Sequence, residues 1–100
     1  MSNGHPPVSD ASYIIICSGR TDVLAAKDSV EKIVAANRCA ANLCAFLQSN
    51  HEVTSGDFAD ISAIQHELMD GMLTLKKNEV DAKVEQMFAL FDELEDKYES

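Results

Sequence analysis

Apolar residues recur at intervals of three and four positions over most of this chain, a spacing typical of helices that bury one side. The first such stretch covers residues 22–49, and its repeating positions hold Val23, Ala26, Val30, Ile33, Asn37, Ala40, Cys44 and Leu47. Thr21 or Asp22 is a suitable N-cap, because either side chain can accept a hydrogen bond from a free backbone N–H. We therefore predict a helix over about residues 22–49.

Two further stretches with the same periodicity follow, over about residues 55–77 and 79–98. Their repeating positions hold Phe58, Ile61, Ile64, Leu68, Met72 and Leu75, and then Val80, Val84, Met87, Phe91, Leu94 and Tyr98. Thr54 followed by Asp57 resembles a capping box at the start of the first of them. The step from Leu75 to Val80 breaks the phase, so we expect a bend or turn near Asn78. One kinked helix over residues 57–98, which would need a second chain to pack on, is the alternative.

The N-terminal part has a different pattern. Residues 1–12 are polar and contain a glycine and two prolines, and we expect a flexible segment there. The run Tyr13-Ile14-Ile15-Ile16-Cys17 lies between serines and predicts a short β-strand. A lone strand leaves its backbone groups unpaired, so it must lie along the helices as an extended arm or pair with another chain.

The predicted fold class is therefore mainly α. We expect a three-helix antiparallel bundle or a helical hairpin, with a short N-terminal strand or arm, in one domain over residues 13–100. A homodimer would use the three isoleucines of the strand, Ile14, Ile15 and Ile16, together with Asn37. Asn37 occupies an apolar position of the repeat, where a polar residue typically specifies register or oligomeric state. A ligand contact is the other interpretation of Asn37.

The charge of the chain is negative and unevenly placed. Seventeen acidic and eight basic residues give a formal net charge of −9. Residues 79–100 hold eight of the acids and only two lysines. A carboxylate in the last turn of a helix interacts unfavourably with the helix dipole, at a cost of about 0.3 kcal/mol or more. Stability alone therefore does not explain this placement, although solubility could.

This acidity restricts the possible partners. A negative protein repels phosphates, so we expect no direct binding to nucleic acid or to an anionic membrane. A basic protein surface is the expected partner, including a protein that itself holds nucleic acid. The predicted partner-binding residues are the acids of the last two helices, namely Glu85, Asp92, Glu93, Asp96 and Glu99, with Asp57 and Asp60. The alternative is a solvated face that only keeps the protein in solution.

No pattern of catalytic or metal-binding residues is present. His5, His51 and His66 lack the spacing of a metal site, and the glycines are too scattered for a phosphate loop. We therefore expect no metal, no cofactor and no enzymatic activity. Three cysteines, an odd number, suit a reducing cytoplasm, and no apolar stretch approaches the length of a membrane span.

In size, acidity and all-helical organisation the chain resembles the small phage- or plasmid-borne inhibitors of bacterial defence of the anti-CRISPR kind. The resemblance concerns the general character of the whole chain and involves no motif, so it assigns no residues. It implies a cytoplasmic protein, in a bacterial or host cell, that blocks DNA binding or nuclease recruitment by a nucleic-acid-handling complex. A structural homodimeric bundle or adaptor with a merely solubilising acidic face is the alternative function.

Overall fold

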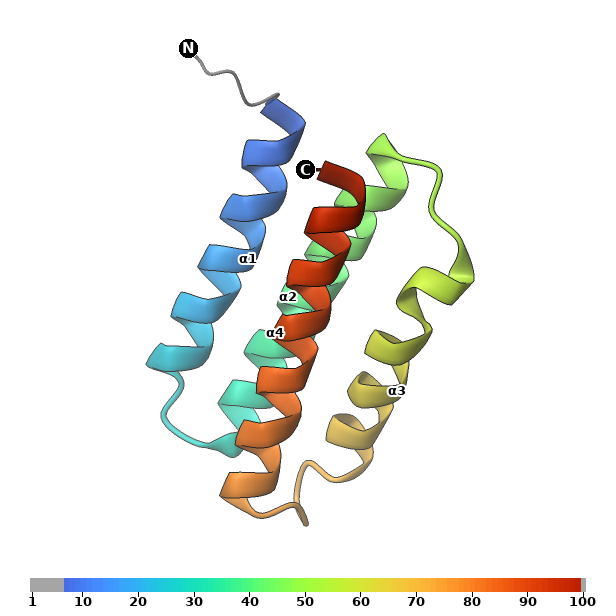
Figure 1. Ribbon diagram of the computed structural model, residues 1–100. Coiled ribbons are helices and arrows are strands. Elements are labelled where there is room, and N and C mark those ends of the chain that lie inside the picture. Colours follow the sequence, from blue (N-terminus) through green and yellow to red (C-terminus); the bar gives the residue numbers. More distant parts are fainter. Residues whose placement is uncertain (1–6, 100) are drawn as a thin grey trace.

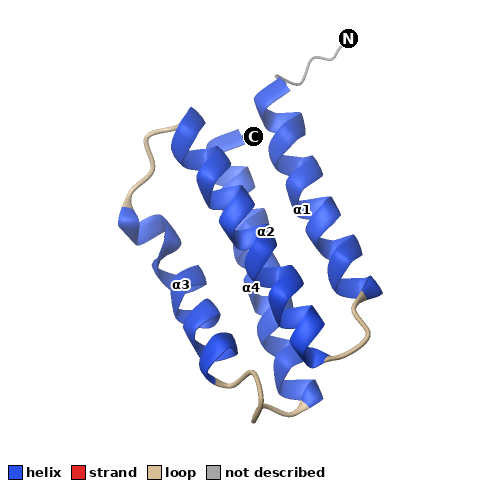
Figure 2. Cartoon of the chain, turned by 180° about the vertical axis from the view of Figure 1, so that it is seen from behind, coloured by secondary structure: helices blue, strands red, loops and turns tan. Residues whose placement is uncertain are grey.

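The computed structural model describes residues 7–99, and the side chains of residues 11–98. Over this range it consists of four α-helices and no strand: α1 (Pro7–Ala25), α2 (Ser29–Asn50), α3 (Ser55–Asp70) and α4 (Lys77–Glu99). Successive helices run in opposite directions, and α4 lies between α1 and α3 with α2 behind it (Figure 1). The view from behind shows α2 in front of α4 (Figure 2). The predicted mainly helical bundle is confirmed.

The N-terminal helix α1 is the main departure from the expected fold. Residues 13–17, predicted as a strand or an extended arm, are helical, and so are residues 7–12, which we expected to be flexible. Residues 1–6 of that segment lie outside the described residues. As a helix, the isoleucine run pairs its own backbone groups and still buries Ile16 in the core. Packing therefore overrides the local β propensity of this run.

The helix predicted over residues 22–49 is divided in two. The chain leaves the helical path after Ala25, and α2 begins at Ser29 with Asp28 as its N-cap. The Asp28 carboxylate accepts a hydrogen bond from the backbone N–H of Glu31 at 2.9 Å. In return, the Glu31 carboxylate accepts one from the backbone N–H of Lys27 at 3.2 Å. An acid followed by Glu three residues later is a helix-start signal, and it competes here with the continuous apolar repeat.

Helices α3 and α4 are separate, so the single kinked helix over residues 57–98 is wrong. The predicted capping box of Thr54 and Asp57 is present at the start of α3. α3 ends at Asp70 rather than near residue 77, because the chain turns at Gly71. The backbone N–H of Leu75 donates to the carbonyl oxygen of Gly71 at 2.8 Å, and its side chain lies where a Cβ on Gly71 would be. The break in the apolar repeat predicted this turn near Asn78. The turn instead begins earlier, at Gly71.

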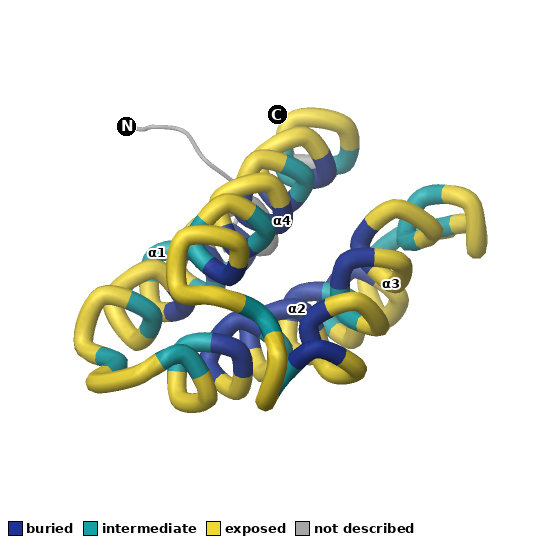
Figure 3. The backbone as a smooth tube through the Cα atoms, turned by 90° about the horizontal axis from the view of Figure 1, so that it is seen from below, coloured by how far each residue is buried: buried dark blue, intermediate teal, exposed yellow. Residues whose placement is uncertain are grey.

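The core lies between α2 and α4, with contributions from α1 and α3. Its buried members are Ile16, Ile33, Ala36, Cys39, Ala40, Leu43, Leu47, Ile61, Ile64, Leu68, Val80, Val84, Met87, Phe88, Phe91 and Leu94. Seen end-on, the buried positions of the helices face one another and the exposed positions face outward (Figure 3). The stripes predicted for α3 and α4 supply most of their core residues. In α2, the predicted Val30, Asn37 and Cys44 lie at the margin, and Ala36, Cys39 and Leu43 replace them.

Candidate partner-binding surface

The side of α4 that faces away from the core carries a row of exposed acids. We call Glu85, Asp92, Glu93 and Asp96 the acidic face of α4; Ala82, Gln86 and Ala89 lie among them and are also exposed. The orientation follows from packing, since Val84, Met87 and Phe91 are buried on the opposite side of the helix. Figure 3 shows this exposed side turned away from α2. The structure thus brings four of the predicted residues onto one surface.

Two lysines of α4, Lys83 and Lys97, lie beside the acidic face and turn toward α3. Lys83 forms an ion pair with Glu67, and Lys97 forms one with Asp57. Between residues 82 and 96, α4 therefore adds no positive charge to its own acidic face. The negative character expected from the sequence is kept on the outer side of the helix.

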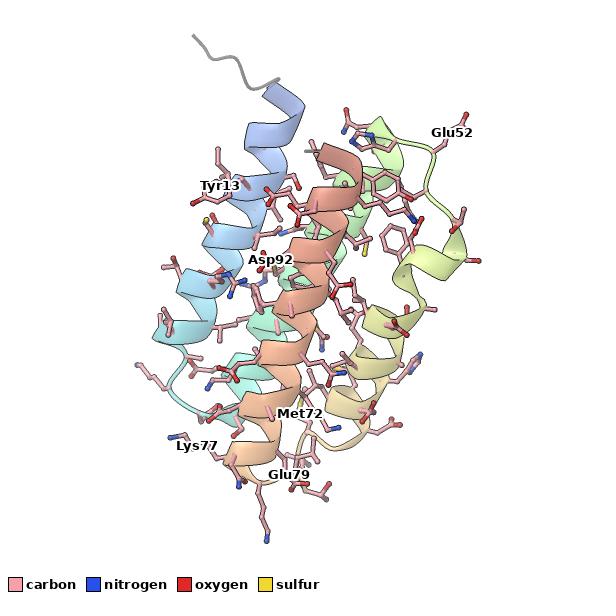
Figure 4. The ribbon with its side chains drawn as sticks, in the orientation of Figure 1. Tyr13, Glu52, Met72, Lys77, Glu79 and Asp92 are labelled. Atoms are coloured by element: carbon pink, nitrogen blue, oxygen red, sulfur yellow. The ribbon has the colours of Figure 1, made fainter. Side chains whose placement is uncertain are left out.

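Asp92 is partly neutralised by α1. One carboxylate oxygen lies 2.6 Å from a guanidinium nitrogen of Arg20, and the two side chains are 53% and 47% exposed. Figure 4 shows Asp92 in the C-terminal half of α4, on the side of α1. The guanidinium also lies 5.0 Å from the centre of the Phe88 ring, which orients it. An ion pair this exposed stabilises a protein by at most about 1 kcal/mol, so a partner could replace Arg20.

Asp57 has a structural role and is not available to a partner. Its side chain is only 8% exposed, and it accepts hydrogen bonds from Lys97 and from the Tyr98 hydroxyl. It also accepts from the backbone N–H of Thr54 at 3.0 Å. The bond from Lys97, followed by those from Thr54 and Tyr98, holds the pKa of this carboxyl well below its usual range. Its capping-box position was the sequence signal for this role.

The two remaining predicted acids differ in position. Asp60 is exposed on α3, between Asp57 and Glu67, which both pair with α4. It therefore lies on the side of α3 next to α4 and extends the acidic surface. The side chain of Glu99 lies outside the described residues.

The predicted dimer residues are not brought together. Ile14 is 60% exposed on α1, whereas Ile15 is partly buried and Ile16 belongs to the core. The side-chain amide of Asn37 is enclosed without a hydrogen-bond partner among residues 11–98. A helix points the three isoleucines in different directions, so Ile16 is used by the core of this chain while Ile14 faces outward. A dimer through Ile14, Ile15, Ile16 and Asn37 stays a prediction.

Groups that could carry chemistry are dispersed. Among residues 7–99, no cluster of three or more His, Cys, Asp or Glu side chains could hold a metal ion. Burial raises the pKa of the Cys39 thiol to about 11, and burial also raises the pKa of Cys44. A thiol with a raised pKa is a poorer nucleophile at neutral pH. The ring of His51 contacts that of Tyr98, with 5.4 Å between the ring centres and a tilt of 37° between the ring planes.

A surface that the sequence reasoning missed lies along α1 and α2. Val30 and Val34 on α2 are 38% and 41% exposed, and Ile14 lies on the same outer side of the helix pair. The signal was present, because the helical repeat of α2 contains more apolar positions than one buried stripe requires.

Comparisons with known proteins assign neither a family nor a function to this chain. Neither a protein-family model, nor a curated protein, nor a solved structure matches this chain. Within the described part of the chain, none of the helices combines the length and the apolar character that crossing a membrane requires.

Proposed function

We propose that this protein acts without catalysis, by docking the acidic face of α4 onto a basic protein surface that otherwise holds nucleic acid. The observation that carries the proposal is the row formed by Glu85, Asp92, Glu93 and Asp96 on one exposed side of a helix anchored in the core. A rigid row of charges recognises a partner at a lower entropic cost than a flexible acidic tail.

The density of these acids resembles that of a nucleic-acid backbone at one end of the row. Asp92, Glu93 and Asp96 lie within about 6 Å along the helix axis, and Glu85 lies about 10 Å before Asp92. One strand of DNA carries a phosphate for about every 3.4 Å of its axis. The two densities are of the same order, and a groove lined with Lys and Arg would attract both.

Occupation of such a groove would exclude its normal ligand. Complementary charge speeds the encounter and makes binding sensitive to salt. The protein would then be a stoichiometric inhibitor that competes with DNA or with a recruited nuclease. The resemblance to anti-CRISPR proteins supports a nucleic-acid-handling complex as the target.

The test compares two double variants with the same change in net charge. Glu85→Lys/Glu93→Lys reverses the acidic face, and Glu52→Lys/Asp70→Lys reverses two exposed acids away from it. Figure 4 shows Glu52 in the loop between α2 and α3. Each protein is used as bait in a bacterial lysate at low salt, and the retained proteins are identified by mass spectrometry.

We expect the wild type and the Glu52/Asp70 variant to retain the same basic partner, and the Glu85/Glu93 variant to lose it. Retention should fall at least tenfold between about 50 mM and 200 mM salt, and free heparin should displace the partner. A partner retained equally by both variants, or retained without regard to salt, would contradict the proposal.

The second candidate function is a structural homodimer or adaptor whose acidic face serves solubility alone. The exposed apolar residues of α1 and α2 favour this candidate, because such residues on a small helical protein often mark a contact surface. Under this function, reversing Glu85 and Glu93 would reduce solubility without removing a partner.

A further inference from the structure

The outer side of the α1–α2 pair forms a continuous shallow groove. Two hollows of about 330 Å³ and 200 Å³ lie along it, and Asp22, from α1, and Arg38, from α2, line both. Val30 and Val34 border the larger hollow, and Ile14 borders the smaller. We call these five residues the α1–α2 groove. Its three apolar members are all at least 38% exposed.

The groove belongs to the uncharged half of the molecule. Residues 1–50 contain four acids and four bases, so their formal charges cancel. Residues 51–100 contain 13 acids and four lysines, which accounts for the whole net charge of −9. Two copies that met through α3 and α4 would repel each other. Two copies that met through α1 and α2 would bring neutral surfaces together.

Asp22 and Arg38 give the groove a charge pattern that complements itself. Both side chains are exposed, and neither forms a hydrogen bond or ion pair with the side chains described for residues 11–98. A twofold axis places each residue of an interface twice, so that residue i of one copy meets residue j of the other and the reverse. The same axis would let Arg38 of each copy pair with Asp22 of the other, with the apolar residues packed around these two ion pairs.

We propose that the α1–α2 groove is the self-association surface of this protein, and that its occupant is the same groove of a second copy. In this dimer the acidic face of α4 stays exposed on each copy, because α4 packs on the inner side of the α1–α2 pair (Figure 3). The proposal does not depend on the proposed function. It replaces the predicted interface at residues 13–17 with one that keeps only Ile14.

The experiment uses charge exchange in the full chain. Asp22→Arg makes the groove wholly basic at its two central positions, and Arg38→Asp makes it wholly acidic there. Molar mass is measured by light scattering and sedimentation over a range of protein concentrations, with circular dichroism as a check on helix content. We expect the wild type to be a dimer, and each single variant to dissociate at least tenfold more readily.

Mixing the two single variants is the decisive measurement. In the mixed pair, both contacts between positions 22 and 38 again join opposite charges, so we expect a one-to-one heterodimer at concentrations where each variant alone is monomeric. A folding defect could not be repaired in this way. Glu85→Arg and Lys77→Asp are the matched controls, since they change the charge by the same amounts outside the groove and should leave the dimer intact.

Three results would overturn the proposal. The first is a wild-type chain that stays monomeric up to about 1 mM, which would leave the groove to a different protein. The second is a dimer that neither groove variant weakens. The third is a mixture of the two variants that contains no heterodimer.

Discussion

At the scale of single residues, Asp57 joins segments that are far apart in the sequence. Its carboxylate caps the start of α3 through Thr54 and binds Lys97 and Tyr98 in the last turns of α4. Each of these contacts favours the ionised carboxylate, and together they hold the pKa of Asp57 well below its usual range. One charged group thereby fixes the end of α4 to the beginning of α3.

This arrangement predicts a loss of stability in acid. Because the pKa of Asp57 is lower in the folded chain than the unfolded value of about 3.9, its contribution is complete above about pH 4 and declines as the pH falls further. We expect Asp57→Asn to lower the free energy of unfolding at pH 7 and to flatten its decline below about pH 4. Urea unfolding at a series of pH values measures both effects.

Asp60→Asn is the matched control for this prediction. Asp60 lies on the same helix and is exposed, so its neutralisation should leave the acid dependence of the wild type unchanged. An Asp57→Asn protein that loses stability in acid as steeply as the wild type would contradict the assigned role of Asp57.

At the scale of helices, the contact between α1 and α2 depends on a residue without a side chain. A Cβ at Gly19 would lie 2.3 Å from Sγ and 2.7 Å from Cβ of Cys39, and 3.2 Å from Cζ of Phe88. The Cys39 thiol donates to the carbonyl oxygen of Ile15, with 3.6 Å between sulfur and oxygen. The two helices therefore approach closely enough for the thiol of one to reach the backbone of the other.

We expect Gly19→Ala to destabilise the fold by about 1–3 kcal/mol, the usual cost of inserting a methyl group into a packed contact. Urea unfolding followed by circular dichroism measures this change. The comparison is Gly56→Ala in α3, where a Cβ would only touch the Thr54 hydroxyl oxygen at 3.6 Å. That change should stabilise the helix by up to about 1 kcal/mol. Equal effects of the two substitutions would show that α1 does not pack as described.

At the scale of the whole molecule, the net charge is concentrated in one half of the chain. The net charge of −9 comes from the half of the chain that contains α3 and α4. The ion pair of Arg20 with Asp92 joins two exposed side chains, and that of Lys83 with Glu67 joins a partly buried lysine to an exposed acid. Exposed pairs contribute about 1 kcal/mol or less each. We expect the mutual repulsion of the acids in residues 51–100 to outweigh these ion pairs.

Added salt should consequently stabilise this protein. We expect the melting temperature to rise between about 20 mM and 500 mM NaCl, because counterions screen the repulsion. The variant Glu85→Gln/Glu93→Gln should start from a higher melting temperature in low salt and gain less on addition of salt. Calorimetry at a fixed protein concentration provides the measurement. A melting temperature that falls with salt would show that the ion pairs outweigh the repulsion.

Periodicity and capping residues were sufficient to predict α4 and the start of α3, but not the end of α3 at Asp70. Their apolar stripes entered the core, and the Thr54–Asp57 capping box formed as expected. The break between α1 and α2 was not predicted, although Asp28 and Glu31 signalled it, because the apolar repeat runs through residues 26–28 without interruption. Of the seven acids predicted to bind a partner, four share one face of α4 and Asp60 lies next to that face. Asp57 instead forms an ion pair with Lys97 of the same chain.

The sequence by itself determined the helical class and the acidic outer side of α4, because both follow from the order of apolar and charged residues along a regular helix. Only the tertiary structure decided the conformation of residues 13–17, the binding of Asp57 to Lys97 and Tyr98, and the exposure of the α1–α2 groove. Each of these depends on contacts between residues distant in the chain. The isoleucine run is helical because the surface that it buries is formed by α2 and α4, which come later in the sequence.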